Sequence, residues 1–441
     1  MTALTQEFLA ELRADAAADP GLKVARNAVM SVGVAKAALD HDKLVAINPA
    51  TEIKLDTLGV TDQMHSGRCW MFAALNAFRH RTAKSLNVEK FEFSYTYLLF
   101  FDKLERVNFY VQALTENPAQ DWDDREMYAL LDAPSSDGGW FNTFANLASK
   151  YGVVPAQVMP ETHSSGHTRE LNRALCTIIR RAVLQARSGA IAADAALAGA
   201  VRDAQRVLAV HLGTPPDPAA EFEWAYRTKD DEFQTIRTTP AQFAAEYLGD
   251  LTEYVTLTAD PREDNELHRV YTAPTANNMA GGQAYTHLNV SSEELAAAAQ
   301  ASLDADEPVW FGCDVDRNFS FIDGVWDEGL VATDALYGID STTTKEERLL
   351  TFGTSVTHAM LLVGTARDSH GARRWRVENS WGPTDPRTKD PIPGNGLATM
   401  TQDWFDENVF EVVVRRAFLT PEQLAALETE PIALPAHDRI L

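Results

Sequence analysis

The sequence predicts an α+β fold in which a helix start and two long helices precede a pair of strands. Residues 70–78 are apolar, lack Gly and Pro, and follow turn residues, a pattern typical of a helix start. Residues 358–366 and 374–380 have the apolar patterns of two strands. Between these regions, residues 169–189 and 193–213 repeat apolar side chains at three- and four-residue steps, and a glycine closes each run, as in helices.

Capping patterns indicate two further helix starts. Thr239 precedes Pro240 and stands three residues before Gln242, and Ser291 stands in the same relation to Glu294. In this pattern each of the two side chains accepts a hydrogen bond from the other residue's backbone N–H, which satisfies donors that the first helical turn leaves free. We therefore expect helices to begin at both places.

Length and composition indicate a soluble globular chain. The 441 residues, of which 45% are hydrophobic, can build two or three sub-domains around one large core. No apolar run approaches the roughly 18 residues that would span a membrane. Residues 1–21 predict an acidic amphipathic helix, with Leu4, Phe8, Leu9 and Leu12 on one side, and they lack the basic and apolar regions of a signal peptide. A cytoplasmic location without membrane contact is the expectation.

The charge balance makes nucleic acid an improbable partner. Against 63 Asp and Glu there are 39 Lys and Arg, a net charge of −24, and a phosphate backbone binds clustered cations. Neither a phosphate-binding glycine motif nor an H-E-x-x-H zinc motif occurs, and the three cysteines have no zinc-ligand spacing. The sequence thus predicts no cofactor and no metal.

Cys69 is the candidate nucleophile. It follows the turn residues Ser66 and Gly67, so it should lie in the first turn of a helix, where free N–H groups and the helix dipole favour a thiolate. The same N–H groups can hold a developing oxyanion, to which Gln63 could add a side-chain N–H. A lone cysteine is otherwise a small buried hydrophobe, which is the interpretation we give to Cys176 and Cys313.

His358 is the candidate base, because it opens a strand whose other residues are apolar. If the strands containing His358 and Asn379 pair as a hairpin, the Asn379 amide can accept the imidazole N–H and fix its tautomer. Trp381 and Gly382 follow, and they offer an aromatic cover and a tight turn. By itself, His358 would rather be interpreted as a satisfied core histidine, and the catalytic interpretation depends on the other candidate residues.

These motifs, "Q-x5-C-W", "T-H-A" and "E-N-S-W-G" in this order, resemble the papain-like cysteine peptidases. Longer stretches, among them "SGRCWMFAALN", "EPVWFGCDVDRN", "SVTHAMLLVG" and "WFDENVFEVVV", resemble the bleomycin hydrolase and aminopeptidase C family, and the similarity extends along nearly the whole chain. Cys69 and His358 lie 289 positions apart (358 − 69), so about 140 residues have been added to a papain-type core.

The resemblance implies a papain-like fold with a cleft between two lobes and a cysteine peptidase that acts through an acyl-enzyme. Cys69 would attack the peptide carbonyl, His358 would transfer the proton, and Asn379 would orient the imidazole. Gln63 would help to stabilise the oxyanion. It further implies that Gly138 and Gly139 form a bare backbone edge for an extended peptide, that the substrates are short peptides, and that the chain is an aminopeptidase assembled as a homohexamer.

This interpretation divides the chain into five parts. The expected parts are 1–60, an N-terminal helical segment for oligomerisation; 61–165, the helical lobe with Cys69; 166–290, a mainly helical insertion; 291–420, the strand-rich lobe with His358 and Asn379; and 421–441, a C-terminal helix and tail that enters the cleft.

The tail departs from the family pattern. Relatives typically read "LPAWDPMG" followed by a few small residues, whereas here His437 occupies the tryptophan position and three residues follow Asp438. Three residues extend at most about 10 Å. The resemblance assigns the terminal carboxylate, here on Leu441, to the substrate's ammonium group, and Arg439 would repel that group unless Asp438 neutralises it. An endopeptidase, or an exopeptidase that releases longer units, is therefore the alternative.

Two other classes stay open from the sequence. Acyltransferases and transglutaminases use a similar Cys-His pair, usually with Asp in third place, and Asn379 within "NSWG" argues against them. A non-catalytic binding protein is the more remote alternative, because no member of the candidate set is substituted.

Overall fold

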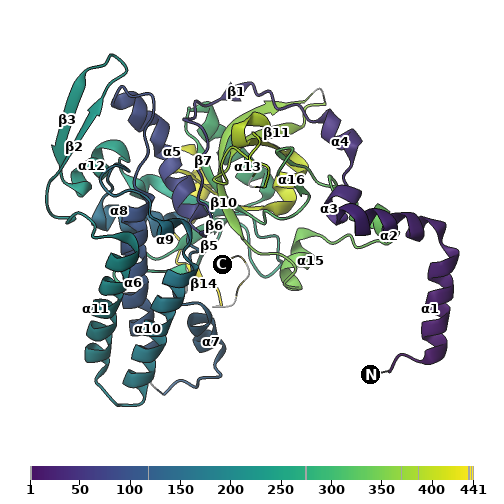
Figure 1. Ribbon diagram of the computed structural model, residues 1–441, viewed down its shortest axis with the longest axis horizontal. Coiled ribbons are helices and arrows are strands. Elements are labelled where there is room, and N and C mark those ends of the chain that lie inside the picture. The colour runs from purple at the N-terminus through teal and green to yellow at the C-terminus, as the bar shows by residue number, and fades with distance from the viewer. Residues whose placement is uncertain are drawn as a thin grey trace.

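The computed structural model describes residues 2–117, 119–273, 276–368, 370–385 and 387–435, together with Asp438 and Ile440. A helical lobe and a strand-rich lobe lie side by side, and the N-terminal helices project away from both (Figure 1).

The helical lobe begins with the helix that carries the candidate nucleophile. Its helices are α5 (Cys69–Ser85), α6 (Tyr95–Glu116), α7 (Arg125–Asp132), α8 (Phe141–Tyr151), α9 (His163–Gly166), α10 (Arg169–Arg187), α11 (Ala193–Leu212) and α12 (Pro240–Tyr247). Strands β2 (Phe222–Arg227) and β3 (Phe233–Thr238) form a separate two-stranded ribbon. Helices α10 and α11 pack on each other and on α6, and they bury residues four apart, such as Leu171, Leu175 and Ile179.

The strand-rich lobe is built on one large sheet. Its strands are β1 (Ile53–Lys54), β4 (Tyr254–Thr258), β5 (Val270–Thr272), β6 (Thr286–Asn289), β7 (Val309–Cys313), β8 (Phe319–Ser320), β9 (Val325–Trp326), β10 (His358–Arg367), β11 (Arg373–Glu378), β12 (Leu397–Thr401), β13 (Val409–Arg415) and β14 (Ile432–Ala433). The strand order is β14-β5-β6-β4-β13-β7-β10-β11-β12-β9-β8, and β1 pairs with β10. The accompanying helices are α13 (Ser292–Asp304), α14 (Thr333–Tyr337), α15 (Lys345–Leu350), α16 (Gln402–Asn408) and α17 (Pro421–Ala426).

The structure confirms the helices and strands that were expected from local patterns. Both capping boxes form, at Thr239 with Gln242 and at Ser291 with Glu294. β10 and β11 pair as an antiparallel hairpin, with Leu361 opposite Glu378. Gly213 ends α11 with a φ of 84°, a left-handed value that favours glycine.

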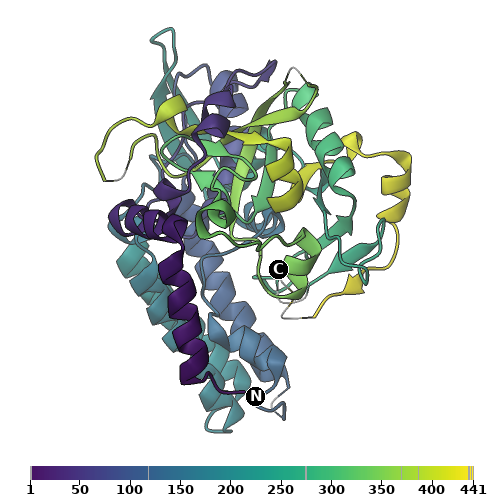
Figure 2. The same cartoon turned by 90° about the vertical axis from the view of Figure 1, so that its right-hand side faces the viewer.

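The helix expected within residues 1–21 forms as α1 (Gln6–Ala18). Three further helices follow it, α2 (Pro20–Val32), α3 (Val34–Ala37) and α4 (His41–Ala46). Asp19 ends α1 and caps α2, because its side chain accepts from two N–H groups of the next turn and Pro20 can only begin a helix there. None of these four helices has a buried residue. Large apolar side chains of this N-terminal arm (residues 4–46), such as Leu4, Phe8, Val24 and Met30, are therefore exposed in the single chain. Figure 2 shows the arm on the side of the molecule that faces the viewer.

One apolar core extends across both lobes. It includes Leu175 of α10, Leu208 of α11, Phe78 of α5 and Trp310 of β7. Strands β4, β5 and β6 lie within residues 166–290, but they belong to the large sheet of the strand-rich lobe and not to the helical lobe. The five-part division of the chain remains a prediction, since this stretch contributes both to the helical lobe and to the sheet.

Candidate active site

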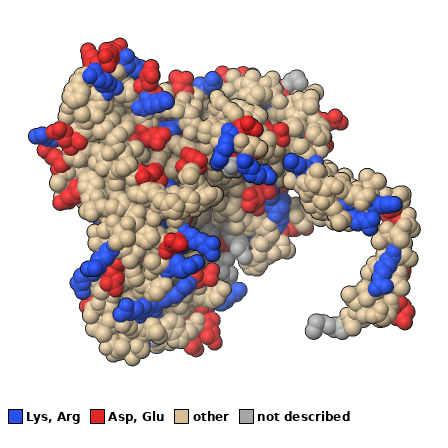
Figure 3. Space-filling model, in the orientation of Figure 1, with Lys and Arg blue, Asp and Glu red and all other residues tan. Residues whose placement is uncertain are grey.

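A cavity of about 300 Å³ lies between the two lobes and contains the candidate nucleophile and base. The helical lobe contributes Cys69, Gly138, Gly139 and Trp140, and the sheet contributes Trp310, His358, Ala359 and Glu411. The space-filling view is hollowed between the lobes, with charged side chains along the rim (Figure 3). Gln63 does not line this cavity.

Cys69 is the first residue of α5, as expected, and Arg68 before it has non-helical dihedral angles. Burial raises the pKa of the Cys69 thiol to about 11, although the backbone N–H groups of Ala359, Trp70 and Cys69 itself act to lower it. The expectation that the helix start favours a thiolate is thus only half right. The N–H groups do favour the thiolate, but burial beneath β10 has the larger effect and favours the neutral thiol as long as no positive charge lies beside it.

His358 opens β10, and Asn379 directly follows β11, so the hairpin brings the two side chains together. His358 Nε2 lies 2.8 Å from Asn379 Oδ1, which also accepts the N–H of Ser380 at 2.7 Å. An amide oxygen only accepts, so Nε2 carries the proton and Nδ1 keeps its lone pair. Burial lowers the pKa of His358 to about 4, against the effect of the Asn379 hydrogen bond. The imidazole is therefore neutral and able to act as a base through Nδ1.

An aromatic side chain covers this pair, as the sequence predicted. The rings of Trp381 and His358 have centroids 4.7 Å apart, and Trp381 also lies against Phe319. Gly382 turns the chain with a φ of 78° and donates its N–H to Thr61 at 3.0 Å. This turn joins the loop that carries Asn379 to the segment preceding α5.

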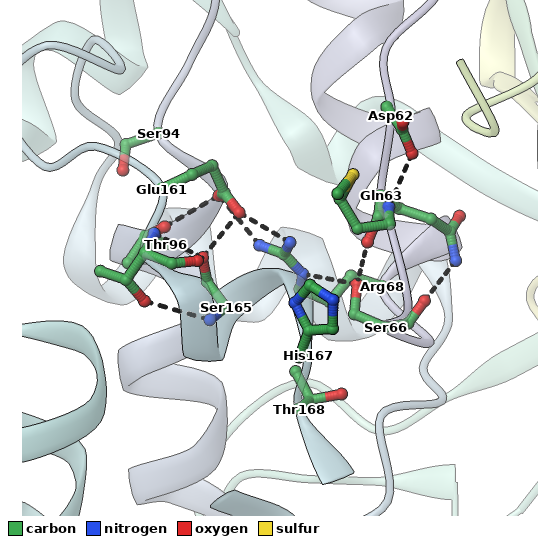
Figure 4. Close-up of polar contacts among 12 residues, drawn as sticks. Asp62, Gln63, Ser66, Arg68, Ser94, Thr96, Glu161, Ser165, His167 and Thr168 are labelled. Carbon is green, nitrogen blue, oxygen red and sulfur yellow. Dashed lines mark hydrogen bonds and ion pairs between the residues drawn. The ribbon is translucent and has the colours of Figure 1, made fainter. Parts of the chain in front are cut away.

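Gln63 is held between those two segments. Its backbone N–H donates to Ser380 at 2.8 Å, and its side-chain oxygen accepts the Ser380 hydroxyl at 2.6 Å. One amide N–H donates to the Ser66 carbonyl at 2.5 Å (Figure 4). The amide has a second N–H, so this arrangement fixes the Gln63 side chain and still leaves one donor for a ligand.

A buried ion pair supports the turn from Gln63 to Cys69. Arg68 is almost fully buried and makes two parallel hydrogen bonds to Glu161, at 3.0 and 2.8 Å, while its Nε donates to Ser66 at 2.9 Å (Figure 4). Such bidentate pairs are strong and directional. The ion pair fixes the residue that precedes the nucleophile. Arg68 was not among the residues predicted from the sequence, although an arginine between a turn and an apolar helix is a visible signal.

Asp137 links the cysteine loop to the glycine pair. Its carboxylate accepts from Gly67 N–H at 3.0 Å and from Lys103 at 2.8 Å, and its carbonyl accepts from the Trp70 indole at 2.7 Å. Burial alone would raise the pKa of Asp137, but the Lys103 ammonium and several hydrogen bonds outweigh it and hold the pKa well below its usual range. The carboxylate is therefore ionised and holds the start of α5 in place.

The two glycines differ in what their missing side chains allow. A Cβ on Gly139 would lie 2.6 Å from the Trp70 indole, so glycine is required there for close packing. A Cβ on Gly138 would meet nothing within 4 Å, and its carbonyl accepts a hydrogen bond from Arg106. Gly138 thus leaves bare backbone at the wall of the cavity.

The other two cysteines occupy different settings. Cys313 is buried on β7 opposite His358, where it belongs to the core as expected. Cys176 on α10 is only half-buried, so the expectation of a core position is only partly met.

The C-terminal tail reaches the same region through Asp438 and Ile440. Asp438 pairs with Arg262 at 3.0 and 2.8 Å, so its charge is already engaged. Ile440 is buried with Leu349 and Phe410, and Val356, which lines the cavity, packs against this cluster. His437, Arg439 and Leu441 lie outside the described residues.

The described part of the chain contains no group of three or more His, Cys, Asp or Glu side chains placed to hold a metal ion. None of its helices is long and apolar enough to cross a membrane.

The chain is similar to known peptidases along nearly its whole length. Residues 3–440 match the model of the "Peptidase C1-like family". The chain is 34% identical to aminopeptidase C of Listeria monocytogenes, over 99% of this chain and 98% of that one, and 37% identical to human bleomycin hydrolase, over 86% and 85%. The crystal structure of PepW from Lactobacillus rhamnosis superposes with a TM-score of 0.94 at 33% identity, covering 100% of this chain and 99% of that one.

Proposed function

This chain belongs to the Peptidase C1-like family, as a papain-like cysteine peptidase similar to aminopeptidase C and bleomycin hydrolase, and we propose that it removes residues from the N-termini of short peptides with Cys69, His358 and Asn379 as catalytic residues. The observation that carries the proposal is the 2.8 Å bond between His358 and Asn379 in the wall of the cavity that also contains Cys69.

The protonation states support a reaction in which both charges form together. Burial disfavours a thiolate alone, with a Cys69 pKa of about 11, and an imidazolium alone, with a His358 pKa of about 4. Transfer of the thiol proton to His358 Nδ1 creates two opposite charges in one cavity, where each stabilises the other. The Asn379 carbonyl then holds the N–H on Nε2 of the imidazolium.

Peptide cleavage proceeds in two steps. The Cys69 sulfur bonds to the peptide carbonyl carbon, and His358 returns its proton to the leaving amine as the C–N bond breaks. A water molecule then attacks the carbonyl carbon of the resulting thioester and gives one proton to His358. The C–S bond breaks, His358 returns this proton to the Cys69 sulfur, and the carboxylic acid leaves. The Cys69 N–H and the remaining N–H of Gln63 stabilise the oxyanion in both steps.

The C-terminal tail supports the choice of aminopeptidase. Asp438 is fixed by Arg262, and the buried Ile440 lies in a cluster against Val356 at the cavity wall. By resemblance to the family, the carboxylate of Leu441 binds the ammonium group of a peptide whose first residue occupies the cleft. Unlike charges attract strongly in such a shielded place. The Gly138 backbone would align the rest of the extended substrate.

The exposed apolar side chains of the N-terminal arm support an oligomer. Val24 and Met30 are 70% and 80% exposed in the single chain, and contacts with other copies would bury them. A homohexamer in the cytoplasm fits this arm and the resemblance to the family. Short peptides are the substrates that such an assembly would admit.

Digestion of matched peptides with free and acetylated N-termini tests the proposal. Sequential loss of single residues from the free peptide, with the acetylated peptide intact, is the expected result. Cys69→Ser and His358→Ala should each abolish turnover while the far-ultraviolet circular dichroism stays that of the wild type. Normal turnover by Cys69→Ser would refute the assignment of the nucleophile.

The second candidate is an endopeptidase or an exopeptidase that releases longer units. It is favoured by the sequence of the tail, in which His437 stands where the family pattern has a tryptophan. Internal cleavage of the acetylated peptide in the same digestion would establish this second candidate. Both candidates use the same catalytic residues and differ only in whether the tail blocks part of the cleft.

A further inference from the structure

Glu411 is a buried carboxylate in the wall of the cavity that contains Cys69. It lies on β13 and is 2% exposed. The Tyr285 hydroxyl donates to its Oε2 at 3.3 Å, whereas Oε1 has no hydrogen-bond partner among the residues that the structure describes. A buried carboxylate oxygen without a donor is unfavourable, and such groups are concentrated at functional sites.

The strand register places Glu411 in one row with Ala359, the residue that follows His358. Glu411 stands opposite Gly312 on β7, and Gly312 stands opposite Ala359 on β10, the residue after His358. The three positions form a row across neighbouring strands. Because strands lie about 4.8 Å apart, the Cα atoms of Glu411 and Ala359 are separated by about 10 Å.

Gly312 makes room for the side chain in the middle of that row. A Cβ on Gly312 would lie 2.5 Å from Glu411 Oε1 and 3.0 Å from Val356, so the carboxylate lies over the glycine. It is therefore roughly one strand spacing, about 5 Å, from Ala359. The backbone of Ala359 in turn forms a hydrogen bond with the Cys69 thiol, so the carboxylate lies on the side of the cavity where a peptide would meet Cys69.

The local charges leave Glu411 without a counter-ion. The other charged side chain in the cavity wall, Arg106, pairs with Asp102 at 3.0 Å through both carboxylate oxygens and also donates to the Gly138 carbonyl. The remaining titratable groups in the wall are Cys69, Tyr110 and His358, and none carries a positive charge in the resting state. Burial accordingly raises the pKa of Glu411 to about 8, and the Tyr285 hydrogen bond lowers it only in part.

We propose that Glu411 is a specificity-determining residue whose carboxylate binds a cationic group of the peptide substrate, an ammonium or a guanidinium, in the cavity beside Cys69 and His358. The assignment rests on the proposed peptidase function. The substrate cation supplies the donors that Oε1 lacks, and its charge keeps the carboxylate ionised at neutral pH. Peptides that carry this cation bind more tightly than neutral peptides of the same shape.

The cation has two possible sources, the α-ammonium and a basic side chain, which four small amides distinguish. Lysinamide, norleucinamide, N-acetyl-lysinamide and N-acetyl-norleucinamide combine the presence and absence of each cation. Their binding is measured as protection of Cys69 from iodoacetamide, with alkylation at each cysteine followed by mass spectrometry. This readout needs no turnover, so it separates failure of the inference from failure of the proposed function.

Glu411→Gln should weaken protection by the amides that carry the recognised cation roughly 10- to 100-fold, as expected for one charge-assisted hydrogen bond. Protection by N-acetyl-norleucinamide should not change. A loss confined to norleucinamide and lysinamide identifies the α-ammonium, and a loss confined to the two lysine compounds identifies the side chain. Glu411→Asp, which keeps the charge at shorter reach, should retain part of the preference.

Glu105→Gln is the matched control, because Glu105 is equally buried but pairs with Lys150 outside the cavity. It should leave all four ratios unchanged. Unfolding temperature and the alkylation rate of Cys69 without ligand show whether each variant retains the site. The inference is overturned if the wild type shows no preference for cationic amides, or if Glu411→Gln weakens all four equally.

Discussion

Replacing Arg262 by leucine should release the C-terminal tail from the strand-rich lobe. Arg262 donates to Asp438 at 3.0 and 2.8 Å and to Asp260 at 2.7 to 3.1 Å, so one cation holds two buried carboxylates. Removing one member of a buried ion pair costs about 3–5 kcal/mol. Asp438→Asn leaves Arg262 paired with Asp260, so it should cost only about 1–2 kcal/mol, in the range of a few hydrogen bonds.

These free energies predict the change in substrate choice. A loss of about 3 kcal/mol makes docking of the tail roughly 100-fold less favourable. An undocked tail leaves the cleft open, so turnover of N-acetylated peptides should rise relative to free peptides, and more in Arg262→Leu than in Asp438→Asn. Arg262→Lys keeps the charge without the bidentate geometry and should lie between them.

The assay compares kcat/KM for one peptide with a free and an acetylated N-terminus. Unfolding temperature and the alkylation rate of Cys69 are measured in parallel, because a general loss of structure would lower kcat/KM for both peptides equally. Deleting Ile440 and Leu441 provides an independent removal of the tail. If the ratio of acetylated to free turnover stays at the wild-type value in Arg262→Leu and in the truncated chain, the tail does not restrict the cleft and the reasoning is refuted.

Three further predictions concern other parts of the chain. Gln63→Ala should lower kcat roughly 10²–10³-fold with little change in KM, because it removes one oxyanion donor. Steady-state kinetics measure both constants, and a variant that changes mainly KM would contradict the prediction. Folding raises the pKa of Glu411 from 4.5 to about 8, so the contribution of Glu411 to stability is full below pH 4.5 and is lost as the pH rises through 8. The unfolding temperature of Glu411→Gln should therefore rise relative to that of the wild type between about pH 5 and 9. A difference in unfolding temperature that stays constant over this pH range would count against the prediction. Deleting residues 2–32 should shift sedimentation to smaller species, since it removes exposed apolar side chains such as Met30, and an unchanged assembly would exclude that segment from the interface.

Much of the fold could be predicted because local patterns determine where elements begin. Ser66 and Gly67 before an apolar run placed the start of α5 at Cys69, and the patterns of β10 and β11 were sufficient to predict their hairpin. Helices α10 and α11 followed from apolar spacing and closing glycines. Each of these signals lies within about twenty residues, so no knowledge of distant contacts was needed.

What could not be predicted depends on contacts between distant segments. The raised pKa of Cys69 arises from burial beneath β10, nearly three hundred residues away in the sequence. The sequence pattern "VFEVVV" is the same whether the Glu411 side chain faces solvent or a cavity. Only the pairing of Glu411 with Gly312 in the folded sheet determines which side it faces. The pairing of Asp438 with Arg262, which stands 176 positions earlier, likewise requires the folded chain.

Trapping of the acyl-enzyme tests the central claim most directly. The wild-type protein is mixed with a peptide ester or amide, quenched in acid within the first turnovers, and analysed by intact mass and peptide mapping. The expected result is a mass increase equal to the acyl group, mapped to Cys69 as a thioester, absent in Cys69→Ser and strongly reduced in His358→Ala. Peptide turnover without any adduct on Cys69, or an adduct on Cys176 or Cys313, would contradict the assignment of Cys69 as the nucleophile.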